Sequence, residues 1–125
     1  MSDPIRRGGI YLVPDTSVNF PPRTLKDRNI KRRRPFLVLS NDATNTDESW
    51  LIVLGFPLST SKDFRSEFDI ELSAAIEGLT EDCWVQVAML QPLAKAKLVT
   101  RLGQVPASEM ERVVTNLARY SGLID

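Results

Sequence analysis

The order of the patterns along the chain limits the fold more than any other feature. Short apolar segments with strand character follow one another, and a single helical pattern comes last. We predict strands at Gly9–Val13, Phe36–Ser40, Trp50–Phe56, Phe64–Leu72, Cys83–Leu90 and Leu98–Gly103. Since no helix separates these strands, the order argues against a parallel sheet. It favours a mainly β fold, a small antiparallel barrel with a C-terminal helix packed on it.

Three expectations concern the inner strands. Phe36–Ser40 is apolar almost throughout, which predicts burial on both faces. Pro57 should end the third strand, and Trp50 and Trp84 should belong to the core. The fourth strand has the clearest alternation, with its acids on a solvated face. Its positions are Phe68, Ile70 and Leu72 against Glu67, Asp69 and Glu71.

The helix is predicted at Pro106–Gly122. Gly122 suits the position just past the last helical residue. At the start, either Ser108 and Glu111 form a capping box or Pro106 is the first helical residue. The apolar residues have helical spacing on one face, which should cover the barrel. They are Met110, Val113, Val114 and Leu117.

Length and composition indicate a single domain over residues 1–125. Apolar residues make up 42% of the chain, yet the longest apolar run is too short to cross a bilayer. The polar N-terminus lacks the apolar stretch of a signal peptide, so we expect a cytoplasmic protein without membrane contact. The one cysteine, Cys83, excludes an internal disulfide and should be a small buried residue.

The chain contains no histidine. This removes the commonest general base, the commonest metal ligand and every catalytic triad built on histidine. With a single cysteine in addition, a zinc site is not expected, and we predict neither a metal nor another cofactor. Any catalysis must use arginine, lysine, hydroxyls or carboxylates.

Basic residues are concentrated in one segment although the net charge of the chain is zero. Residues 23–34 carry seven cations and one acid, a net charge of +6. They end a long polar stretch, Pro14–Arg33, in which we expect no regular structure. Such long loops inside compact domains are functional or disordered. The concentrated charge predicts a local site for anions.

Several segments, taken together and in order, resemble the MazF/PemK/Kid family of toxins. The most specific is Arg34–Asp42, RPFLVLSND, which is similar to the family's RP-x-(L/V)-V-(L/I)-(S/Q)-N-D strand. It is accompanied by Arg7–Val13, by Pro57–Ser61 at the family's P-x-T element, by Gly78–Val85 and by Arg101–Gly103 before the helix. The resemblance covers nearly the whole chain. It implies an SH3-like barrel of the CcdB/PemK type, a homodimer, cleavage of single-stranded RNA at short sequences, and an antitoxin whose acidic disordered tail blocks the RNA groove.

The resemblance also implies catalytic positions. The family's arginine before proline corresponds to Arg34, and its threonine to Ser59, with Thr60 as the neighbouring alternative. Metal-free cleavage uses the 2′-OH of RNA as nucleophile and leaves a 2′,3′-cyclic phosphate. Arg34 suits stabilisation of the phosphoryl charge, because a guanidinium is permanently charged and grips two oxygens at once. On the residues alone, Arg34 is also explained as part of a solvated basic run, and Ser59 as a turn hydroxyl.

The other cations of the basic segment are expected to line the RNA path, where phosphate contacts supply affinity rather than sequence preference. They are Arg23, Lys26, Arg28, Lys31, Arg32 and Arg33. Phe20 is either a stacking surface for a base or an anchor of the loop.

One departure bears on activity. Many members carry an acid and a second arginine in the fifth-strand region, and Ala88 and Gln91 stand at these positions here. Two alternatives therefore stay open. The same barrel occurs in CcdB-like toxins, which poison DNA gyrase, and the departure suggests a catalytically weakened RNA-binding member of the family.

Overall fold

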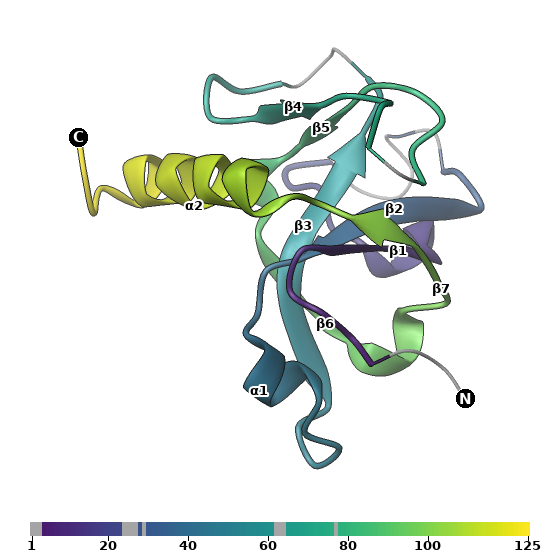
Figure 1. Cartoon of the computed structure of the whole chain (residues 1–125). Helices are drawn as coiled ribbons and strands as arrows, with labels where there is room; N and C mark the ends of the chain where they lie inside the picture. Colours follow the sequence, from purple (N-terminus) through teal and green to yellow (C-terminus); the bar gives the residue numbers. More distant parts are fainter. Residues whose placement is uncertain (1–3, 24–27, 29, 62–64, 77) are drawn as a thin grey trace.

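The computed structural model, which describes residues 4–23, 28, 30–61, 65–76 and 78–125, contains one curled antiparallel sheet with a C-terminal helix beside it (Figure 1). The strand order is β4-β5-β3-β2-β1-β7, and β6 also pairs with β3. The predicted mainly β fold is confirmed. The strands are β1 (Gly9–Pro14), β2 (Arg33–Val38), β3 (Ile52–Ser59), β4 (Ile70–Leu72), β5 (Cys83–Val85), β6 (Gln91–Ala94) and β7 (Thr100–Gln104).

The long strand β3 is the centre of the sheet, since it pairs with β2 on one edge and with β5 and β6 on the other. The prediction that Pro57 ends this strand is wrong. Pro57 lies where the partner changes from β6 to β5, and its carbonyl oxygen still accepts a hydrogen bond from the Gln86 backbone N–H (3.2 Å). Trp50 precedes the strand and is 50% exposed, so its assignment to the core is also wrong.

The predicted strand Cys83–Leu90 is interrupted. After β5 the chain makes the 3-10 turn η2 (Val87–Met89) and only then continues as β6. The predicted strand Phe64–Leu72 is reduced to β4, and Phe64 lies outside the described residues. Asp69 is not on a solvated strand face, because its Oδ1 accepts a hydrogen bond from the Val87 backbone N–H (3.1 Å).

Two helices follow the predicted pattern in part. Helix α1 (Asp42–Asn45) is a single turn capped by the Asn41 side chain, and α2 (Ala107–Ser121) is the predicted C-terminal helix. Pro106 immediately precedes α2, and no side chain caps this end, so neither predicted start is formed. Gly122 has the positive φ of 82° that ends a helix in the left-handed region.

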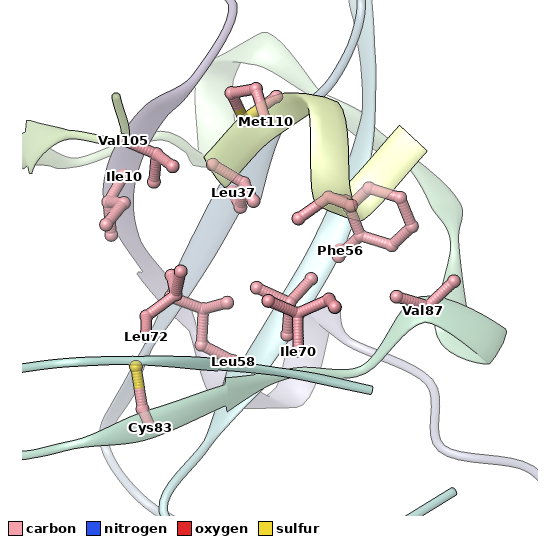
Figure 2. Packing of buried hydrophobic residues seen from close by; sticks show 12 residues of the cluster. Ile10, Leu37, Phe56, Leu58, Ile70, Leu72, Cys83, Val87, Val105 and Met110 are labelled. Atoms are coloured by element: carbon pink, nitrogen blue, oxygen red, sulfur yellow. The ribbon is translucent and has the colours of Figure 1, made fainter. Parts of the chain in front are cut away.

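The core lies on both faces of β2. Leu37 belongs to a cluster that Met110 and Val113 of α2 cover, whereas Phe36 and Val38 belong to a second cluster on the other face. Figure 2 shows the first cluster, in which residues of β1, β2, β3, β4 and β5 meet beneath the start of α2. Burial of Phe36–Val38 on both faces is thus confirmed. Val114, predicted on the covering face, is 38% exposed.

None of the helices among the described residues combines the length and apolarity that crossing a membrane requires.

Candidate functional site

A buried carboxylate, Asp15, organises the basic segment. It begins the 3-10 turn η1 (Asp15–Ser17), directly after β1, and has no exposed surface. Its Oδ1 accepts hydrogen bonds from Arg28 Nη1 (2.9 Å) and Arg34 Nε (2.7 Å), and its Oδ2 accepts one from the Lys31 backbone N–H (2.8 Å). Burial by itself raises the pKa of Asp15, but the bonds from Arg34, Lys31 and Arg28 outweigh it and hold the pKa below its ordinary value of 3.8. Asp15 is therefore an anion near neutral pH.

Arg34 points inward from the second position of β2 and is only 7% exposed. Besides its bond to Asp15, it donates from Nη1 to the Leu58 carbonyl oxygen at 2.9 Å. Leu58 directly precedes Ser59. A hydrogen bond thus joins the two segments in which the sequence predicted catalytic residues. Within the described part of the chain, Nη2 of Arg34 has no hydrogen-bond partner, which leaves that edge for a ligand.

Arg28 is also turned inward. Its Nη2 donates to the carbonyl oxygens of Asp15 (2.8 Å) and Val18 (3.0 Å), in addition to the Nη1 bond to the Asp15 carboxylate. The side chain is 5% exposed. Because its hydrogen bonds fix the chain after β1, Arg28 holds the loop together rather than lining an RNA path as predicted.

Phe20 packs against the guanidinium groups of this cluster. The Cζ atoms of Arg28, Arg34 and Arg23 lie 4.6, 4.7 and 5.4 Å from the ring centroid. The ring is buried, so it offers no open face to a base. Of the two roles predicted for Phe20, its burial favours the loop anchor.

The end of β3 places the two predicted hydroxyls beside the basic segment. Ser59 Oγ accepts a hydrogen bond from the Ser61 backbone N–H at 3.1 Å. Since this bond uses the oxygen as acceptor, the hydroxyl proton is left to donate. Thr60 Oγ1 lies 3.5 Å from Nζ of Lys31. The structure therefore brings Arg34, Ser59, Thr60 and Lys31 together.

The outward-facing cations lie at the start of β2. Lys31, Arg32 and Arg33 are all exposed, as a phosphate-binding surface requires. Arg23 is half-buried against Phe20, and Lys26 lies outside the described residues.

Gln91 closes the loop from the opposite side. Its Oε1 accepts from the Asn19 backbone N–H (2.9 Å), and its Nε2 donates to the carbonyl oxygens of Asn19 (3.0 Å) and Met89 (2.9 Å). Ala88 is half-buried in η2. These positions, where many MazF-like proteins carry charge, clamp the loop here.

Other routes to catalysis find little support. Burial raises the pKa of the Cys83 thiol to about 11, with a smaller contribution from Asp82 and Glu81, so a reactive thiolate is not formed. Among the described residues, no cluster of three or more acids and cysteines suits a metal ion.

The sequence analysis missed Asp15, the residue on which the cluster is centred. The available signal was the charge balance: seven cations in residues 23–34 have one acid among them, and buried arginines need a partner from elsewhere. An acid directly after a strand, where the chain turns, was the candidate.

Comparison with known proteins gives a consistent result. A family model described as "PemK-like, MazF-like toxin of type II toxin-antitoxin system" matches residues 6–120. Endoribonuclease MazF9 of Mycobacterium tuberculosis is 28% identical over 112 residues, covering 87% of this chain and 89% of that protein. Endoribonuclease MazF6 of the same organism is 31% identical over 92 residues, covering 74% and 81%.

Solved structures with the same fold include a mycobacterial endoribonuclease in complex with its cognate antitoxin. It has a TM-score of 0.67 and 22% identity, over 99% of both chains. The MazE-MazF structure (Form-II) from Deinococcus radiodurans has a TM-score of 0.69 and 20% identity, over 97% of this chain and 98% of that chain.

Proposed function

Since the chain belongs to the PemK-like, MazF-like family of toxins of type II toxin–antitoxin systems, we propose that it is an endoribonuclease that cuts single-stranded RNA at short sequences without a metal ion. The observation that carries the proposal is the hydrogen bond from Arg34 to the Leu58 carbonyl oxygen. It holds a permanent positive charge beside the Ser59 hydroxyl.

In the proposed reaction the 2′-oxygen attacks the adjacent phosphorus, and the bond from phosphorus to the 5′-oxygen breaks. The products are a 2′,3′-cyclic phosphate and a 5′-hydroxyl. Arg34 stabilises the charge that builds up on the phosphoryl oxygens through Nη2. Such preorganised stabilisation is effective because the group needs no reorganisation when the charge develops.

Asp15 holds Arg34 in place and is a poor proton acceptor. Three donors occupy its carboxylate, and its pKa is lowered. A carboxylate of this kind orients a guanidinium without removing a proton from RNA. Ser59 donates its hydroxyl proton to a phosphate oxygen or orients the 2′-OH, and Thr60 is the alternative one residue along.

RNA reaches this site over the exposed cations Lys31, Arg32 and Arg33, whose charges attract the phosphates. The same cations suit an acidic disordered tail of a cognate antitoxin, which would compete with RNA for them. An antitoxin complex is known for a structural relative with the same fold.

We also propose a homodimer that forms the RNA groove between its subunits. Exposed apolar side chains lie at the start of β3 and on the outer edge of α2, where a second subunit can cover them. They are Trp50, Leu51, Ile52 and Leu54 in the first patch and Val114, Tyr120, Leu123 and Ile124 in the second. Sedimentation at micromolar concentration should give the dimer mass, and a monomer mass throughout would contradict the shared groove.

A second candidate is a catalytically weakened RNA-binding member, because Ala88 and Gln91 supply neither acid nor second arginine. The gyrase-directed alternative is set aside, since the matching family is the MazF-like one. One experiment separates the remaining candidates: the pure protein is incubated with mixed-sequence RNA in EDTA. Fragments ending in cyclic phosphate support the nuclease, whereas intact bound RNA supports the weakened member.

A further inference from the structure

The row of residues that contains Ser59 continues across the sheet. In the antiparallel pairing, Ser59 lies opposite Trp84 of β5, and Trp84 lies opposite Glu71 of β4. Directly opposed residues in antiparallel strands place their side chains on the same face. On the other edge, β2 and β3 pair with Phe36 opposite Pro57, and the same register two residues further brings Arg34 level with Ser59. Arg34, Ser59, Trp84 and Glu71 therefore form one row on one face.

Trp84 is on the opposite face of β5 from the core. Its neighbours Cys83 and Val85 are buried in the main cluster, whereas Trp84 is half-buried. The assignment of Trp84 to the core is thus only partly right. Arg65 lies over the indole, with its Cζ 3.8 Å from the ring centroid. Among the described residues this ring contact is the interaction that Arg65 makes, so its N–H groups are not committed to a carboxylate.

We propose that Trp84 and Arg65 form a stacking subsite for the RNA base next to the cleaved phosphate. The inference rests on the proposed function and assigns the substrate's base to named residues. A planar guanidinium on an indole extends a flat surface onto which a base stacks, because every base has a π face and arginine stacks on bases as aromatic rings do. The exposed Arg65 provides that outer surface.

The charges along the row fix the direction in which RNA lies. Arg34, with Lys31 near Thr60, makes one end positive, and Glu71 makes the other end negative. The phosphate therefore lies at the Arg34 end, and the base points along the row toward Trp84. Glu71 repels a second phosphate, so the backbone leaves the row instead of following it across β4.

The test uses the intact protein with Trp50→Phe, which leaves Trp84 as the reporter since the chain has two tryptophans. The probe is a mixed-sequence RNA with every 2′-OH methylated, which cannot be cleaved by the proposed route. Its binding is followed independently by the anisotropy of a label on the RNA. Trp84 emission should be quenched in parallel with the rise in anisotropy. The matched control, Trp84→Phe with Trp50 retained, should bind with no change in emission.

Substitutions measure the contribution of the stack. Trp84→Leu should bind methylated RNA about tenfold more weakly, and Trp84→Phe within about threefold of wild type. Arg65→Ala changes an exposed residue and leaves the core intact; it should weaken binding about threefold to fivefold. Arg65→Lys, which keeps the charge but not the plane, should resemble Arg65→Ala.

The outcomes separate the two claims. RNA binding without quenching of Trp84, or unchanged binding by both Trp84→Leu and Arg65→Ala, overturns the subsite even if unmodified RNA is cleaved. Quenching and weakened variants without any cleavage of unmodified RNA support the subsite and overturn the nuclease. The absence of RNA binding overturns both.

Discussion

The basic segment contains two groups of cations with opposite fates. Arg28 and Arg34 turn inward onto Asp15 and pack on the Phe20 ring, whereas Lys31, Arg32 and Arg33 point into solvent. Arg33 and Arg34 are neighbours in β2, and side chains alternate between the faces of a strand. Two adjacent arginines therefore have different chemistry: one is fixed beside the β3 end, and the other is a mobile surface charge.

The inward cluster is fixed because burial of a charge requires a partner. Removing one member of a buried ion pair costs about 3–5 kcal/mol, since the other charge is left uncompensated. Exposed cations interact weakly with their neighbours, by about 0–1 kcal/mol. Stability should thus depend on the inward cluster, and the salt dependence of RNA binding on the outward cations.

The largest effect is expected for Asp15→Ala. Two buried guanidiniums lose their shared carboxylate, and the free energy of unfolding should fall by about 3–5 kcal/mol. The control Glu81→Ala removes an exposed acid and should change it by less than about 0.5 kcal/mol. Urea unfolding of both variants checks this. A loss below about 1 kcal/mol for Asp15→Ala would show that the cluster does not stabilise the fold.

Acid should weaken the inward cluster selectively. The pKa of Asp15 is lower in the folded protein than its ordinary value of 3.8. Its contribution to stability is therefore complete above that value and is lost as the pH falls toward the folded pKa. Unfolding free energies between pH 5 and about pH 2 should fall more steeply for wild type than for Asp15→Asn. Identical slopes would mean that Asp15 titrates alike in both states.

Charge reversal should affect the outward cations without changing stability. The double variant Lys31→Glu with Arg32→Glu should reduce the slope of log K for RNA binding against log salt by about 2, because each lost phosphate contact removes about 0.7–0.9. The control, Lys97→Glu with Arg119→Glu, has the same net charge but changes exposed residues elsewhere. Equal slopes for the two double variants would place RNA away from β2.

The smallest effect is expected at the end of β3. Ser59→Ala should slow RNA cleavage about fivefold to tenfold, the scale of one lost hydrogen bond. Thr60→Ala should slow it less, since Thr60 is the neighbour of the assigned position. The cleavage rates of both variants decide the register: a larger loss for Thr60→Ala would move the catalytic hydroxyl by one residue.

Much of the fold followed from local patterns. The element order and the helical spacing of Met110 and Val113 predicted the sheet and α2 correctly. The breaks were harder, because Pro57 was treated as a strand end. Its position depends on β3 changing partners from β6 to β5, a long-range pairing that no local pattern contains.

The candidate site was predicted in outline. Motifs located Arg34 and Ser59, but the fate of each cation depends on Asp15. Counting charges cannot distinguish Arg28 from Arg32, since burial arises from tertiary contacts. Likewise, only the strand register places Trp84 beside Ser59.

The central claim is that the inward arginine acts on RNA while its outward neighbour only attracts it. The most direct test compares single-turnover cleavage in EDTA by Arg34→Lys and Arg33→Lys, both of which keep the charge. Arg34→Lys should be at least about 100-fold slower than wild type, because lysine cannot bond Asp15, the Leu58 carbonyl and a phosphate at once. Arg33→Lys should stay within about threefold of wild type. Equal rates for the two variants would contradict the account.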